Sequence, residues 1–156
     1  MGLDTSHNCW HGSYTVFGAW RQQVALAGGY TLKERSDVPW PSVDLPWDMF
    51  KQENYKGDWA DGPAVEDPLL YLIVHSDADG VIHPEEGRHL AARLEQILPA
   101  LTKQGAPDLA ARLEQFVPGL TVERNWMTDE WLEKTTQQFI KGLRDAAADG
   151  EDVQFY

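Results

Sequence analysis

The sequence predicts a mainly α-helical, single-domain fold with one helix-loop-helix unit and a small β-bridge that joins the chain termini. Three observations predict it. Apolar residues recur at helical spacing in several segments, one twelve-residue stretch has oxygen ligands spaced as in a cation-binding loop, and the last five residues alternate polar and apolar. With 156 residues and 42% hydrophobic content, the chain is large enough to bury a core. We therefore expect residues 1–156 to form one domain.

Four segments carry the helical pattern. Ser13 can cap a helix that runs to about Ala27 and stops at two glycines. An apolar run at 69–74 is the end of a second helix, a stripe from Leu90 to Leu101 marks a third, and 129–148 forms the last. The side chains expected in the core are Trp20, Leu72, Leu94, Phe116, Trp131, Phe139 and Leu143.

Residues 90–102 recur almost unchanged at 109–121, an offset that indicates duplication of one helix. The second copy, at 108–121, has no ligand pattern before it, so the duplication adds a helix and no second cation loop. By contrast, 31–67 shows no sustained period and is rich in proline and tryptophan. We expect a proline-stiffened flap whose tryptophans cover the helices; the alternative is a ligand groove lined by those tryptophans.

The stretch at 75–86 reads His-Ser-Asp-Ala-Asp-Gly-Val-Ile-His-Pro-Glu-Glu. With Gly80 at position 6, where a calcium loop turns sharply, oxygen ligands fall at positions 3, 5, 7 and 12, and a histidine falls at position 1. The candidate metal ligands are His75, Asp77, Asp79, Val81 through its carbonyl, and Glu86. This loop and its two flanking helices, about 67–102, resemble the EF-hand family, from which they depart at the first ligand.

The histidine at position 1 changes the expected metal chemistry, because it removes one negative charge from the ligand set. Calcium remains the favoured ion but should bind weakly, and the mixed nitrogen and oxygen set also suits zinc or manganese. The alternative is a helix-loop-helix without metal, in which Asp77 or Asp79 caps the outgoing helix.

A second cluster of Asp4, His7, Cys9 and His11 precedes the first helix. A structural zinc site needs about four such ligands, but these spacings are tighter than is usual. Cys9 could be a nucleophile with a histidine base, yet beside Trp10 it is more often an inert packed thiol.

The backbone of Ile82, at position 8 of the loop, needs an extended partner because buried peptide groups are rarely left unpaired. The candidates are residues 3–5 and 153–155. If the N-terminal segment pairs there, His7 lies near the loop and could add a ligand or a general base.

The formal charge of −12 disfavours direct binding to nucleic acid or to an anionic membrane. One cysteine excludes an internal disulfide and suggests a reducing compartment. Neither a signal peptide nor a membrane span is visible, so we expect a cytoplasmic protein without a membrane partner.

The opening Met-Gly-Leu-Asp-Thr-Ser-His, the His-Ser-Asp-Ala-Asp-Gly at 75–80 and the closing Val-Gln-Phe are similar to a family of small uncharacterised phage, prophage and bacterial proteins. The resemblance implies a protein that acts in an infected or lysogenic cell, and it supplies no activity.

Three classes of function remain. We favour a small acidic metal-binding protein that acts as a binding or interaction module for an unknown protein or small molecule. The alternatives are a metal-dependent hydrolase of phosphoesters or nucleotides that uses the His-rich N-terminus, and an acidic phage-encoded inhibitor of a host protein.

Overall fold

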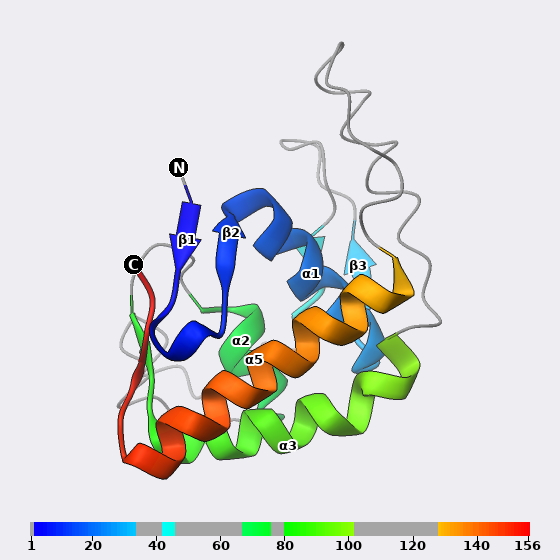
Figure 1. The fold of residues 1–156 in the computed structure, drawn as a ribbon. Helices are drawn as coiled ribbons and strands as arrows, with labels where there is room; N and C mark the ends of the chain where they lie inside the picture. Colours follow the sequence, from blue (N-terminus) through cyan, green and yellow to red (C-terminus); the bar gives the residue numbers. More distant parts are fainter. Residues whose placement is uncertain (1, 34–41, 46–66, 76–79, 102–127) are drawn as a thin grey trace.

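The protein is described from a computed structural model that covers residues 2–33, 42–45, 67–75, 80–101 and 128–156. In these ranges the fold is mainly helical, as the sequence predicts (Figure 1). The α-helices are α1 (Tyr14–Ala27), α2 (Leu69–Ile73), α3 (Pro84–Leu101) and α5 (Asp129–Asp149), and η1 (Ser6–Asn8) is a short 3-10 helix. The strands are short: β1 (Gly2–Asp4), β2 (His11–Ser13), β3 (Leu32–Lys33), β4 (Ser42–Val43), β5 (Val81–Ile82) and β6 (Val153–Gln154).

The ends of the helices follow from local sequence. The Ser13 hydroxyl accepts a hydrogen bond from the Val16 N–H and caps α1. The Thr128 hydroxyl does the same for α5, and Gly150 ends that helix in the left-handed conformation, with φ 68°. Pro84 opens α3, where a missing N–H costs nothing.

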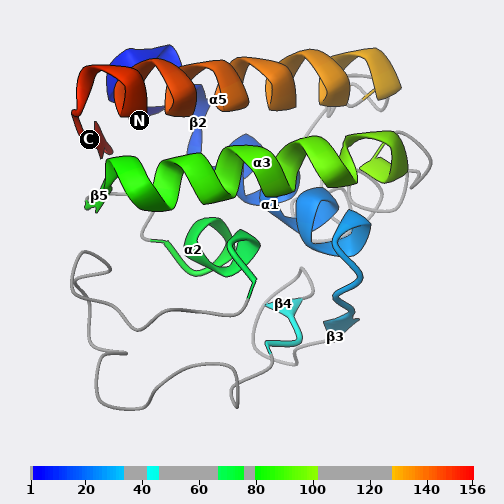
Figure 2. The same cartoon turned by 90° about the horizontal axis from the view of Figure 1, so that it is seen from below.

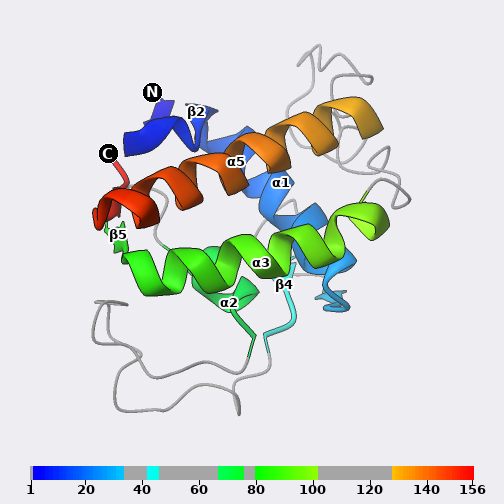
Figure 3. The same cartoon turned by 60° about the horizontal axis from the view of Figure 1, so that its bottom comes forward.

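The core lies where α3 and α5 run side by side, with α1 packed across them and α2 beneath (Figures 2 and 3). Trp20 is fully buried against Phe139, and its indole N–H donates to the Thr136 hydroxyl at 3.0 Å. Of the side chains expected in the core, Trp20, Leu72, Leu94, Phe139 and Leu143 are buried. Trp131 is only partly buried, at the edge of the same cluster.

The two ends of the chain are joined by backbone hydrogen bonds. The amides and carbonyls of Asp4 and Tyr156 exchange two hydrogen bonds of 2.9 Å, and Thr5 forms a bridge with Phe155. On its other side the C-terminal segment pairs with β5, so that Ile82 lies opposite Val153. The expected partner of Ile82 is therefore present, and it is the C-terminal candidate rather than the N-terminal one.

Several features differ from the sequence-based expectation or extend it. At the N-terminus, β1 and β2 form an antiparallel pair that the sequence did not predict. Within 31–67, β3 and β4 pair where no periodic pattern was found. The helix before the loop, α2, has five residues and is much shorter than the α3 helix that follows it.

Three expectations concern segments outside the described residues: the duplicated helix at 108–121 with Phe116, most of the proline and tryptophan segment, and the loop carboxylates Asp77 and Asp79. Among the helices that are described, none combines the length and the apolar character that crossing a membrane requires.

Candidate metal site

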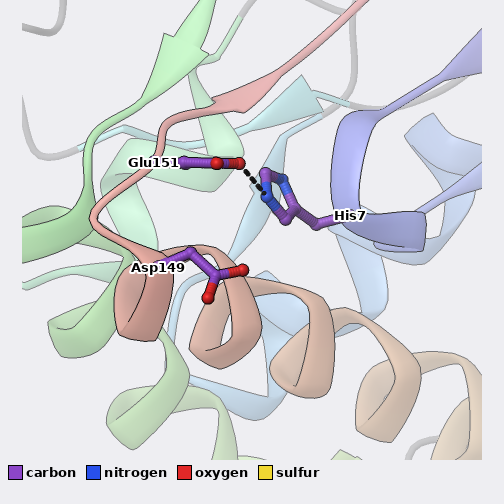
Figure 4. A group of neighbouring side chains, drawn as sticks. All are labelled: His7, Asp149 and Glu151. Carbon is purple, nitrogen blue, oxygen red and sulfur yellow. Dashed lines mark hydrogen bonds and ion pairs between the residues drawn. The ribbon is translucent and has the colours of Figure 1, made fainter.

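A histidine and two carboxylates meet where η1 approaches the end of α5. His7, Asp149 and Glu151 each direct one ligand atom into the same space, and these atoms lie within 4.8 Å of one another (Figure 4). Tetrahedral zinc ligands with bonds of about 2.1 Å lie roughly 3.4 Å apart. Small side-chain rotations of the two exposed carboxylates would therefore close the group around one ion.

Backbone geometry turns His7 toward this space. His7 has φ 57° and Asn8 has φ 55°, both in the left-handed region that histidine and asparagine enter more readily than most residues. The Asn8 carbonyl accepts a hydrogen bond of 3.0 Å from the Gln138 side chain on α5. Strained backbone of this kind is often found at functional sites, where surrounding contacts hold it in place.

The close approach of η1 to α5 depends on Gly142. A Cβ atom there would lie 2.4 Å from the Cys9 Sγ and 2.9 Å from the His7 carbonyl oxygen. Such distances are too short for non-bonded atoms, so only glycine allows η1 to lie this close to the helix.

The carboxylates occupy an electrostatically unfavourable position. Asp149 is the last residue of α5 and Glu151 follows two residues later, at the negative end of the helix dipole. The last turn of α5 has no basic residue of its own, and Arg88 of α3 reaches it with one hydrogen bond of 3.1 Å to the Ala147 carbonyl. A bound cation would reduce this concentration of negative charge.

The cluster borders an open pocket of about 410 Å³, whose lining is polar or acidic at every position except Gly150. The residues that line it are Ser6, His7, Gly150, Glu151, Asp152 and Gln154. An ion at the cluster would therefore face solvent on one side.

Both ring nitrogens of His7 have hydrogen-bond partners. Nε2 lies 2.8 Å from the Glu151 Oε2, and Nδ1 lies 3.0 Å from the Ser6 hydroxyl. A carboxylate only accepts, so a neutral imidazole carries its proton on Nε2 and accepts the Ser6 proton at Nδ1.

The second cluster expected from sequence is rearranged. The His7 side chain contacts Glu151 instead of the other members of the cluster. The His11 side chain pairs with Asp4, which lies opposite it in the β1–β2 pair. Cys9 is buried, and burial is the main reason that its thiol pKa rises to about 12, although a hydrogen bond with Thr5 acts in the opposite direction. Within the described ranges these four residues do not form a group of three ligands, and Cys9 is buried in the core.

The cation loop expected at 75–86 is described only at its two ends. Gly80 has φ 103°, as a sharp turn at position 6 requires. The buried His75 ring stacks on Phe155 with centroids 4.2 Å apart, and its Nε2 lies 3.1 Å from the Val81 carbonyl oxygen. Two candidate ligands of the loop therefore contact each other directly.

Glu86, the last candidate ligand of that loop, lies in the first turn of α3. Its carboxylate accepts a hydrogen bond of 3.3 Å from the His83 N–H, which is half of a capping box. Burial raises the pKa of Glu86, and the hydrogen bond from His83 only partly opposes this. The imidazole of His83 in turn lies 2.7 Å from the Asp152 carboxylate.

Asp149 and Glu151 were not among the candidates from sequence. No ligand spacing links them to His7, which is more than 140 positions away, so only the meeting of the two termini reveals the group. The signal that could have found them is the run Asp149-Gly-Glu-Asp152 directly after a helix that lacks a basic last turn.

Searches of protein family models, curated proteins and solved structures found no significant match to this chain.

Proposed function

We propose that this protein is a divalent-cation-binding module that holds its ion with His7, Asp149 and Glu151. The single observation that carries the proposal is the convergence of three ligand atoms within 4.8 Å. The rest of the argument is electrostatic, since the two carboxylates lie at the negative end of a helix in a chain of net charge −12.

The ligand set favours a particular class of ion. One imidazole nitrogen with two carboxylate oxygens suits zinc or manganese better than it suits calcium, which takes six to eight oxygens. Three protein ligands beside an open pocket leave at least one coordination position to water or to a ligand. The described lining of the pocket offers no lysine or arginine to a phosphoester in that position, so this geometry does not favour the hydrolase alternative.

Calcium in the loop at 75–86 is a second candidate. It is favoured by the positive φ of Gly80, by the pairing of Ile82 with Val153, and by the half-buried carboxylate of Glu86 at position 12. A cation near Glu86 would offset the cost of keeping that carboxylate ionised.

Calorimetric titration with zinc, manganese and calcium of protein first stripped with a chelator tests the main proposal. The His7→Ala variant should bind zinc at least about tenfold more weakly than the unaltered chain, because it loses the nitrogen ligand. His11→Ala is the matched control, since His11 is an exposed histidine of the same segment and lies outside the cluster. Equal zinc affinity of His7→Ala and the unaltered chain, or no binding by either, would contradict the proposal.

A further inference from the structure

Ser6 lies directly behind the candidate ligand His7, and its hydroxyl has three polar neighbours. It accepts a hydrogen bond of 2.9 Å from the Gln154 N–H. Its single proton then has two acceptors within reach: His7 Nδ1 at 3.0 Å and the Asp152 carbonyl oxygen at 3.4 Å. The hydroxyl can therefore point in either direction without losing its bond from β6.

Cation binding determines which of these two acceptors the Ser6 hydroxyl must use. Without an ion, Glu151 accepts the Nε2 proton of a neutral His7, and Nδ1 must accept a proton from Ser6. An ion on Nε2 requires that nitrogen to be bare, so the ring carries its proton on Nδ1 instead. The ring releases one proton from Nε2 to solvent and takes up one at Nδ1, so its total is unchanged.

From this arrangement we infer that Ser6 is a positioning residue of the cation site. Its hydroxyl proton points to His7 Nδ1 without the ion and turns to the Asp152 carbonyl oxygen when the ion binds. In the ion-bound state the Nδ1 proton is donated to the Ser6 oxygen, and the Ser6 proton turns to the Asp152 carbonyl. Both states then leave every polar group of the Ser6–His7 pair satisfied. The inference rests on the proposed function, because it takes His7 as a ligand.

The alternative acceptor is what distinguishes Ser6 from an ordinary hydrogen-bond partner. If Asp152 offered no carbonyl, the Ser6 proton would have to turn away from the ring toward solvent in the ion-bound state, and the hydroxyl would be held less firmly behind His7. Partners of this kind behind metal-bound histidines fix the tautomer and the ring orientation.

Zinc titration of Ser6→Ala and Ser6→Thr tests the inference. Ser6→Ala should weaken zinc binding about 10- to 100-fold, whereas Ser6→Thr, which keeps the hydroxyl, should stay within about threefold of the unaltered chain. Unfolding of each variant in chelator reports separately on the lost bond to the Gln154 N–H, which is a purely structural effect.

Proton and nitrogen NMR of His7 gives a readout that a structural role alone would not change. The zinc-loaded, unaltered chain should show a protonated Nδ1 whose proton exchanges slowly with water, and this protection should be lost in Ser6→Ala. If Ser6→Ala does not fold, the exchange rate of the Nδ1 proton in the zinc-loaded, unaltered chain is by itself the test of the inference.

Equal zinc affinity of Ser6→Ala and the unaltered chain, or rapid exchange of the Nδ1 proton in the loaded, unaltered protein, would overturn the role of Ser6. In both of those results the unaltered chain still binds zinc. Absence of zinc binding by the unaltered chain would instead remove the proposed function itself, so the two failures are distinguishable.

Discussion

Paired polar side chains join segments that are distant in sequence, and Asp67 is at the centre of one such set of contacts. Arg93 of α3 donates to both of its oxygens, at 3.1 and 3.4 Å, and the Tyr30 hydroxyl donates at 2.7 Å. The Leu69 N–H, at the start of α2, also donates to this carboxylate, at 3.0 Å. One carboxylate therefore ties the segment after α1 and the start of α2 to α3. Because the pair is only partly shielded from solvent, loss of the Asp67 carboxylate should cost about 1–3 kcal/mol of stability.

Cys9 gives a prediction at the same scale. Its pKa is raised from 9.0 to about 12, chiefly by burial, so the thiolate fraction at pH 8 is about a thousandfold lower than in an exposed cysteine. We expect a thiol reagent to label the native protein at pH 8 slower by at least this factor than the protein in denaturant.

The same shift has a consequence for stability. A thiol whose pKa is higher in the folded state contributes its full stabilisation below about pH 9, and the contribution is lost as the pH rises toward about 12.

Rapid labelling of native Cys9 at pH 8, at the rate seen in denaturant, would show that the thiol is not buried and would restore the nucleophile hypothesis.

At the scale of elements, the close contact between η1 and α5 positions the candidate site. Alanine substitutions at two glycines test how much the site depends on that contact. Gly142→Ala would place a Cβ 2.4 Å from the Cys9 Sγ, so η1 must move. We expect a loss of stability of about 1–3 kcal/mol, together with weaker zinc binding. Chemical denaturation in chelator and a zinc titration measure the two effects.

Gly18→Ala is the matched control, because Gly18 lies within α1 and, among the described residues, no other element comes within 4 Å of a Cβ placed there. Alanine should stabilise that helix by about 0.5–1 kcal/mol and leave zinc affinity unchanged. Stabilisation by Gly142→Ala of the same size would mean that η1 does not pack closely on α5.

The elements themselves could be predicted from sequence where local physics decides them. Ser13, Pro84 and Gly150 mark helix ends by capping and backbone geometry, and the alternation of Val153 and Phe155 predicts the two side chains that are buried in the C-terminal strand. The pairing of Ile82 could be expected because its backbone needs a partner, but two segments satisfied that need equally well.

The candidate site could be predicted only in part, because its ligands come from opposite ends of the chain. His7 was recognisable from its chemistry. Asp149 and Glu151 were not, since exposed acidic residues are common and nothing local distinguishes these two. The hydrogen bond between His75 and the Val81 carbonyl likewise depends on how the chain turns at Gly80, which ligand spacing does not specify.

At the scale of the whole molecule, the C-terminal segment lies between the N-terminal segment and β5 (Figure 1). The Phe155 N–H donates to the Gly80 carbonyl at 3.0 Å, while Glu151, four residues earlier, contacts His7. Both candidate cation positions therefore adjoin one short segment. An ion held by His7, Asp149 and Glu151 would link the two ends of the chain, and its binding free energy would add to the stability of the fold.

Anomalous diffraction at the zinc absorption edge, from crystals grown with zinc, tests the central claim most directly because it locates the ion. We expect a peak about 2.0–2.1 Å from the His7 Nε2, with oxygens of Asp149 and Glu151 at about 2.0–2.2 Å. Crystals without a peak among these three side chains, or with the strongest peak inside the loop at 75–86, would contradict the claim.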